Sequence, residues 1–260
     1  MPGRPSRAPA AAPIIAVAGA LALWEVLTRT GMLPERYLPP MTETAQELSR
    51  LMGTSDFWSA VWNTMKGWAL GLGIALVLAI PAGIAIGSST LLYRSVRVFI
   101  EFLRPIPSVA LIPLAVLIYG TGLDSKVFLA AFASFWPLLI QTLYGVRDVD
   151  PVATDTARAY GLGRLERLWR IKLPSAIPYI ATGVRISSAV ALILAVTAEL
   201  VIGAAGLGRE INLARSGGAL ENMYALIIAT GAIGWMLNIL TTRGEKRVLH
   251  WHPSQREMAR

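Results

Sequence analysis

The chain has 260 residues, of which 54% are hydrophobic and only 15% are charged, and it carries a net charge of +8. Soluble domains carry about 25% charged residues, so this composition excludes an ordinary soluble domain and indicates an integral membrane protein. The positive charge does not require a nucleic-acid partner, because membrane proteins concentrate Lys and Arg in their cytoplasmic loops. Cysteine is absent, which excludes disulfides and thiolate metal sites.

Six apolar runs predict an all-α membrane protein with six transmembrane helices. A span needs about 20 apolar residues, so the third run is short unless its helix extends into neighbouring residues. We expect one transmembrane domain over residues 13–242, a disordered N-terminal tail over residues 1–12 and a C-terminal tail over residues 243–260. The predicted spans are residues 13–27, 58–86, 108–119, 127–145, 175–202 and 223–242.

The first apolar run admits two interpretations. Arg4 and Arg7 precede it and Ala20-Leu21-Ala22 resembles a cleavage site, so the run could be a signal peptide. We favour a retained span, because five more apolar runs follow it. With six spans, Lys and Arg are concentrated on the side of both termini, which places both termini in the cytoplasm.

Two short segments between the early spans have an amphipathic pattern. Thr44-x-x-Glu47 reads as a capping box and predicts a short helix to Met52 on the external surface, although a plain surface loop fits equally well. Residues 91–104 alternate arginines with apolar residues, which predicts an amphipathic helix on the cytoplasmic face.

Glycines recur at a spacing of four residues in the second span. Gly67-x-x-x-Gly71 and Gly83-x-x-x-Gly87 leave space for a neighbouring backbone to approach closely. We therefore predict that these glycines serve helix packing rather than gating.

A polar and basic island interrupts the apolar sequence at residues 146–174. Basic loops between spans stay in the cytoplasm, so we expect this island there. From Pro151 to Tyr160, a proline at the helix start and several small residues predict a short helix, which Gly161 ends. A short helix held out of the membrane by two spans is suited to docking a soluble partner. Six of the 24 Lys and Arg lie in the island: Arg147, Arg158, Arg164, Arg167, Arg170 and Lys172.

The island resembles the cytoplasmic loop of bacterial ABC importer permeases, which reads Glu-Ala-Ala, three residues, Gly, nine residues, Ile, any residue, Leu-Pro. This chain has Asp for Glu, which keeps the charge, and Thr for the first Ala, which keeps the small size. The resemblance implies a type I importer permease of a bacterial inner membrane, with a coupling helix between spans four and five that is seated in a groove of an ATPase subunit. The residues it assigns to coupling are Asp155, Thr156, Ala157, Tyr160, Gly161, Ile171, Leu173 and Pro174.

A second stretch, Arg-Pro-Ile-Pro-Ser-Val-Ala-Leu-Ile-Pro-Leu at residues 104–114, resembles the permeases for nitrate, sulfonate and taurine more narrowly. The resemblance implies a homodimer that carries a small anion delivered by an extracytoplasmic binding protein. Gly206-Leu207-Gly208, in the external loop of residues 203–222, would contact that protein. ATP and Mg would be bound by the partner ATPase, and this chain would bind no cofactor.

Two ionisable residues in the fifth span are candidates for lining the translocation path. Arg185 suits an anion, although its long stem could instead carry the charge to the membrane interface. Glu199 lies near the outer end, where a structural or gating role fits better and where it could also lie in water.

The sequence contains no catalytic constellation. An ATPase would need Gly-x-x-x-x-Gly-Lys-Ser/Thr, and no such segment occurs. The only histidines are His250 and His252 in the C-terminal tail, which argues against an intramembrane Ser-His dyad and against a metal site. We predict a transport subunit rather than an enzyme. The alternative is an ATP-independent channel or secondary carrier, which would need more charged residues within its spans than Arg185 and Glu199.

Overall fold

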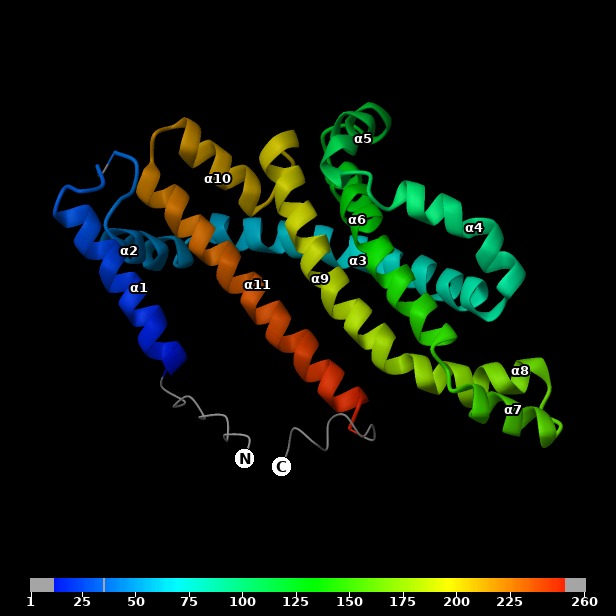
Figure 1. Cartoon of the computed structure of the whole chain (residues 1–260). Coiled ribbons are helices and arrows are strands. Elements are labelled where there is room, and N and C mark those ends of the chain that lie inside the picture. Colours follow the sequence, from blue (N-terminus) through cyan, green and yellow to red (C-terminus); the bar gives the residue numbers. More distant parts are fainter. Residues whose placement is uncertain (1–11, 35, 251–260) are drawn as a thin grey trace, which may run out of the picture.

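The computed structural model describes residues 12–34 and 36–250, and every regular element within them is a helix. The helices α1, α11, α9 and α6 run at a similar slant, and short helices gather at the ends of the molecule (Figure 1). The expected N-terminal tail, apart from Ala12, lies outside the described residues. The elements are α1 (Ala12–Arg29), α2 (Met41–Met52), α3 (Ser55–Ser88), α4 (Thr90–Leu103), η1 (Ser108–Leu111), α5 (Ile112–Tyr119), α6 (Leu123–Arg147), α7 (Pro151–Ala159), α8 (Arg164–Arg167), η2 (Leu168–Lys172), α9 (Leu173–Ile202), α10 (Leu207–Ser216) and α11 (Leu220–Val248).

Four helices in the described part are long and apolar enough to cross a membrane. They are α3, α6, α11 and one continuous run of 39 residues from Arg164 to Ile202 that joins α8, η2 and α9. These four coincide with the second, fourth, sixth and fifth expected spans. The helix α1 covers the first expected span and continues to Arg29.

The third expected span differs from its prediction. Ser108–Tyr119 begins as the 3-10 turn η1 and continues as α5, which has only 8 residues, so the segment is too short to cross a membrane alone. Instead, α4 and the segment Ser108–Tyr119 form a pair bent by 81°, either one broken span or a re-entrant loop. Pro105 and Pro107 stand at the bend, where proline removes backbone donors and prevents the helix from continuing. The amphipathic segment predicted over residues 91–104 is therefore half of this pair.

Two matching rows of residues hold α3 against α6. The glycines Gly67, Gly71, Gly83 and Gly87 on α3 are all buried, as expected for helix packing. A Cβ on Gly71 would lie 2.6 Å from the Cβ of Ala130. The same register continues along both helices at intervals of four residues, so the rows run parallel. The opposing pairs are Gly67 with Lys126, Gly71 with Ala130, Gly83 with Thr142 and Gly87 with Val146.

The helix α9 packs antiparallel on another face of α6. Near one end, a Cβ on Gly145 would lie 3.0 Å from the Cα of Ala176. Further along, the Ser187 hydroxyl donates a hydrogen bond of 2.7 Å to the carbonyl oxygen of Ser134. Small residues on both helices thus allow close contact over most of their length, which makes α3, α6 and α9 the central layer of the bundle.

A buried ion pair joins these three helices at the end where α6 begins. The ammonium of Lys126 lies 2.8 Å from Oε1 of Glu199, and the two side chains are 1% and 0% exposed. Lys126 also donates to the carbonyl oxygens of Asn63 and Ala205, at 2.8 and 2.9 Å. The three hydrogen bonds satisfy all three ammonium protons, so the charge is buried without an unmet donor.

The second carboxylate oxygen of Glu199 holds the segment that follows α9. This oxygen accepts from the Thr64 hydroxyl and from the backbone N–H of Gly208, each at 2.9 Å. Thr64 in turn accepts from the backbone N–H of Leu207 at 2.9 Å. The ion pair therefore fixes α10 against α3 and α9 as well as joining the three central helices.

The glycines around the ion pair are required by space. A Cβ on Gly67 would lie 2.5 Å from Cε of Lys126, and one on Gly206 would lie 2.1 Å from Cδ of Glu199. Gly206 also has φ of +153°, in the region where L side chains are strained. Leu207 is fully buried. The Gly206-Leu207-Gly208 motif thus packs inward, and the expectation that it presents a surface to an external protein is wrong.

Three further sequence expectations need correction. Lys126 directly precedes the predicted span of residues 127–145 and so falls outside it, but α6 begins at Leu123 and the lysine is buried in the bundle. Thr44 does not cap a helix: α2 begins three residues earlier, and the Thr44 hydroxyl donates to the carbonyl oxygen of Pro40 at 3.0 Å. The last helix continues past residue 243 to Val248, so part of the expected tail is helical.

We expect Glu199→Gln to destabilise the protein strongly, because it leaves the Lys126 ammonium buried without a counter-charge. Removing one partner of a buried ion pair costs about 3–5 kcal/mol. The measurement is thermal unfolding of the purified protein in detergent. A matched control is Glu47→Gln, since Glu47 forms a surface pair with Arg50 worth no more than about 1 kcal/mol.

The double variant Lys126→Met with Glu199→Gln should recover part of the lost stability, because no unpaired charge remains. An unfolding temperature of Glu199→Gln equal to that of Glu47→Gln would contradict the role assigned to the pair.

Candidate functional site

The helix α7 forms where the sequence predicted a docking helix. Asp150 caps it, with its carboxylate accepting from the backbone N–H of Val152 at 2.8 Å. Pro151 occupies the first turn, where its missing N–H leaves no unmet bond and its fixed φ suits a helix. The helix ends at Ala159, one residue before the expected end.

Gly161 ends α7 through a Schellman motif. Its φ is +81°, and its backbone N–H donates to the carbonyl oxygen of Arg158 at 3.0 Å. The N–H of Leu162 donates to the carbonyl oxygen of Ala157, also at 3.0 Å. This pair of bonds satisfies carbonyls at the helix end and requires a left-handed residue at the glycine position. Glycine at this position of the loop motif is therefore explained by the left-handed conformation that ends α7.

The residues of the Asp155-Thr156-Ala157 motif differ in their exposure to solvent. Ala157 is buried, with 6% of its surface exposed. Asp155 and Thr156 are exposed, and Asp155 pairs with Arg158 at 3.1 Å on the surface. Tyr160 is 81% exposed. The motif thus places one small side chain against the protein and leaves polar and aromatic groups free for a partner.

Ile171, Leu173 and Pro174 lie where the loop enters the fifth span. The turn of residues 168–172 is a π-helix, and Pro174 follows it in the first turn of α9. A proline inside an α-helix removes a hydrogen bond and its ring clashes with a preceding carbonyl, which a wider π-turn can accommodate. The helix therefore continues from the loop into the membrane span without an interruption in its path.

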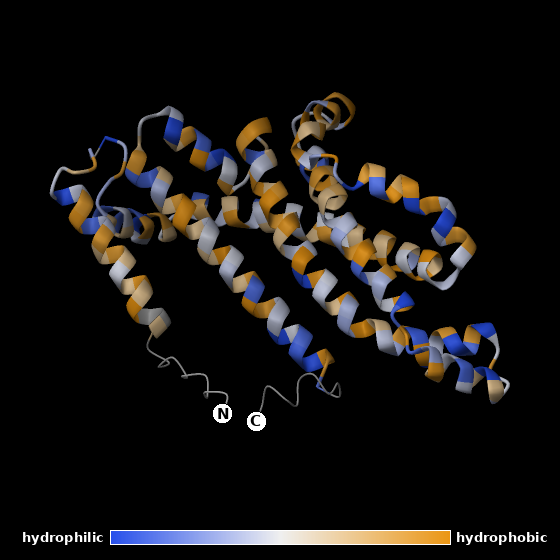
Figure 2. Cartoon of the chain, viewed as in Figure 1, coloured by the Kyte–Doolittle hydropathy of each residue, from blue (hydrophilic) through white to orange (hydrophobic). Residues whose placement is uncertain are grey.

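The outer surface of the loop combines exposed apolar residues with positive charge. Figure 2 shows hydrophilic residues concentrated in α7 and α8, in contrast to the mostly apolar α1. Among them, four large apolar side chains are 62–81% exposed: Val152, Tyr160, Leu165 and Trp169. A groove beside them has a volume of about 440 Å³ and is lined by Ser88, Thr154, Arg158, Arg164, Leu165, Arg167, Leu168 and Lys172.

Such a surface is suited to binding another protein. Apolar side chains exposed within a polar segment indicate an interaction site. The arginines and lysine around the groove favour a partner surface that carries negative charge, which would speed association and fix the register.

The two path candidates of the fifth span lie in different surroundings. Arg185 pairs with Glu245 of α11 at 3.3 Å, and its side chain is 40% exposed. Glu199 is fully buried in the ion pair with Lys126. These contacts favour a supporting role for Glu199, while Arg185 retains an exposed portion; a role of either residue in the path stays a prediction.

Sequence reasoning missed Lys126 because the charged residue was placed in the turn before the predicted span of residues 127–145. A signal was available in the spacing of small residues: Lys126 lies four residues before Ala130, in the row that opposes the α3 glycines. Extending that row by one step places the lysine stem over Gly67, the position with room for it.

Comparison with known proteins identifies the family. Residues 75–248, more than half of the chain, match the family described as binding-protein-dependent transport system inner membrane component. The chain is 30% identical over 237 residues to the taurine transport system permease protein TauC of Escherichia coli K12, covering 89% of this chain and 86% of that protein. It is 28% identical over 238 residues to the putative aliphatic sulfonates transport permease protein SsuC of Bacillus subtilis 168, covering 90% and 85%.

Solved structures give the same fold. The chain matches an inward-facing structure of the MetNI methionine ABC transporter with a TM-score of 0.64 and 19% identity, covering 73% of this chain and 94% of that one. This likeness shows the type I ABC importer permease fold, as expected from the sequence. With the family match and the TauC identity, the chain belongs to the inner-membrane permease components of binding-protein-dependent ABC transport systems.

Proposed function

We propose that this chain forms the translocation path for a small anion, such as taurine, another sulfonate or nitrate, in an ABC importer. The named relatives serve taurine and aliphatic sulfonates. Separate ATPase subunits would supply the energy and bind ATP and Mg, an extracytoplasmic binding protein would deliver the anion, and a second copy of the chain would complete the path. Both termini would lie in the cytoplasm, with lipid around the bundle.

The observation that carries the proposal is the exposed loop surface on the end of a membrane-length helix. Tyr160 and Leu165 are 81% and 68% exposed beside a groove with four basic residues. The loop is also rigid, because Asp150 caps α7 at one end and Gly161 closes it at the other. A rigid surface with apolar anchors can transmit a displacement of its partner to the spans.

The path of that displacement follows one helix. The run Arg164–Ile202 has 39 residues, which corresponds to about 58 Å at 1.5 Å per residue. It begins next to the docking surface and carries Glu199 near its far end. Closure of the ATPases on ATP would move α7 and tilt this helix from an inward to an outward arrangement, and hydrolysis would restore the inward one.

The alternative function is an ATP-independent channel or secondary carrier. A carrier that couples to ions would place several charged groups in its spans. Along α9, Glu199 is neutralised by Lys126 and Arg185 is paired with Glu245. Neither arrangement resembles a free ion-binding residue, and the docking surface would have no purpose in such a protein.

We expect Gly161→Ala to weaken binding of the ATPase subunit. The left-handed conformation costs an L residue about 1–2 kcal/mol, and no atom lies within 4 Å of the added Cβ, so strain rather than a clash is tested. The loss corresponds to a roughly five- to thirtyfold higher Kd. The measurement is co-purification and titration with the ATPase encoded for this system, using chain in detergent.

Gly163→Ala is the matched control, because Gly163 has φ of −65° and an added Cβ would make only an ordinary contact, 3.8 Å from Oε2 of Glu166. It should bind the ATPase within about twofold of the native chain, a difference well under 1.4 kcal/mol. If both variants bind equally well, or if the native chain binds no ATPase, the coupling role is wrong.

A further inference from the structure

The helix α4 carries a stripe of charge along one face. Arg94, Arg97 and Glu101 of α4 and Arg104, which directly follows α4 with helical backbone angles, are spaced three and four residues apart, which places them on the same side. The opposite side carries Phe99, which is 66% exposed. Such a helix separates a polar face from an apolar face.

The charged stripe runs along α6 toward the middle of the bundle. At one end, the guanidinium of Arg147, the last residue of α6, lies 3.9 Å from the centre of the Tyr93 ring. Beyond the bend, the hydroxyl of Ser125, near the start of α6, donates to the carbonyl oxygen of Ala115 at 3.0 Å. The bent pair therefore extends along the length of α6, and Arg104 lies between the two ends.

The charged face of α4 is not suited to contact with lipid tails. Arg104 has no ion pair among the described residues, and an unpaired charge within a bilayer is costly. It shares a cleft with Ile140, which lies seven residues, or about 10 Å, before the end of α6. The polar face of α4 must therefore meet water or polar groups, as residues along a transport path do.

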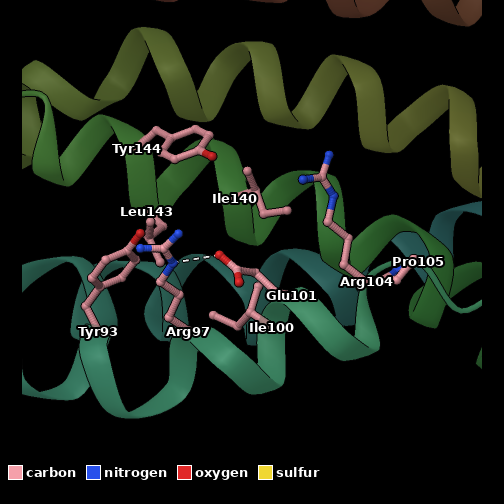
Figure 3. Close-up of a pocket in the computed structure, with 9 residues that line it drawn as sticks. All are labelled: Tyr93, Arg97, Ile100, Glu101, Arg104, Pro105, Ile140, Leu143 and Tyr144. Carbon is pink, nitrogen blue, oxygen red and sulfur yellow. Dashed lines mark hydrogen bonds and ion pairs between the residues drawn. The ribbon is translucent and has the colours of Figure 1, made fainter.

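A cleft lies between this face of α4 and α6. Its volume is about 380 Å³. In Figure 3, Arg97 and Tyr93 extend from α4, Tyr144 and Ile140 from α6, and Arg104 projects toward α6 beside Ile140. The guanidinium of Arg97 is held by Glu101 at 2.6 Å. The cleft thus has two guanidinium groups, one carboxylate and two phenolic hydroxyls.

We propose that this cleft is a transient binding site for a small oxyanion on the translocation path, with Arg104 and Arg97 as its principal ligands. That the bound anion is the transported cargo rests on the function proposed above. The sulfonate, nitrate and carboxylate groups share the planar or tripodal oxygens that a guanidinium binds through two parallel hydrogen bonds. Tyr93 and Tyr144 supply hydroxyl donors at the rim of the same cleft.

Glu101 limits the affinity of the site, which allows the bound anion to leave. Because Arg97 is already paired with Glu101, an arriving anion competes with a carboxylate for that guanidinium. Arg104 provides the net attraction, and the carboxylate limits the affinity. A site on a conduction path must bind strongly enough to be entered and weakly enough to be left.

The test uses the natural absence of cysteine from the chain. Ile140→Cys introduces a single thiol into the cleft next to Arg104, in the full chain embedded in phosphatidylcholine nanodiscs. Its labelling rates with an anionic (sulfonatoethyl) and a cationic (trimethylammonioethyl) methanethiosulfonate reagent are compared with those of a free thiol in solution. We expect the anionic reagent to be favoured at least about tenfold, because the nearby unit charge of Arg104 attracts it and repels the cationic reagent.

Adding Arg104→Gln should remove most of that preference, whereas Arg94→Gln should retain it, because Arg94 does not line the cleft. Methanesulfonate should slow labelling of Ile140→Cys in the chain with native Arg104. Phe99→Cys, on the apolar face, should react with neither reagent. The proposal is wrong if Arg104→Gln leaves the preference unchanged, if methanesulfonate gives no protection, or if Phe99→Cys reacts like Ile140→Cys.

The phosphate of a lipid headgroup offers similar oxygens to the guanidinium groups of this cleft. Labelling that slows in phosphatidylglycerol discs, without protection by methanesulfonate in either lipid, would assign the cleft to a headgroup and overturn the proposal. The labelling experiment needs no ATPase, so its result is separate from that of the proposed function. If the native chain binds no ATPase but methanesulfonate still protects the Ile140→Cys variant, the importer role alone is refuted. If the chain binds the ATPase but methanesulfonate gives no protection, the anion site alone is refuted.

Discussion

The buried ion pair between Lys126 and Glu199 is the constraint on which the architecture depends. Two opposite charges removed from water are tolerated only when every donor and acceptor is satisfied, and here the satisfying groups come from α3, α6, α9 and the segment of Ala205 and Gly208 where α10 begins. The glycines at positions 67, 206 and 208 follow from it, because each leaves room for a side chain or backbone of this cluster. One electrostatic contact thus determines where four segments meet.

The opposite end of the same helices is built on a different principle. Beyond α6 and before α9, the chain leaves the apolar bundle and forms a rigid loop whose surface is basic and carries exposed aromatic and aliphatic side chains. The run of 39 residues from Arg164 to Ile202 connects the two ends. A bundle fixed at one end and exposed to a partner at the other can convert a displacement of the loop into a tilt of the spans.

Much of this arrangement could be predicted from local sequence. Apolar runs located α3, α6, α9 and α11 to within several residues, and the start and stop residues of the basic island located α7. What could not be predicted depends on contacts between distant segments. Lys126 is buried only because Glu199, 73 residues later, neutralises it and Gly67 leaves it space. Likewise, the bend beside Pro105 and the inward packing of Leu207 follow from neighbours that periodicity alone does not reveal.

The central claim is that the α7 loop docks an ATPase, and site-specific cross-linking tests it most directly. A single cysteine in place of Tyr160, in a chain with none of its own, would be compared with one in place of Tyr37, which is 62% exposed on the segment before α2. In membranes containing the ATPase subunit, a short thiol-to-amine cross-linker should join Tyr160→Cys to the ATPase and leave Tyr37→Cys free. Equal cross-linking at both positions, or cross-linking only at position 37, would contradict the account.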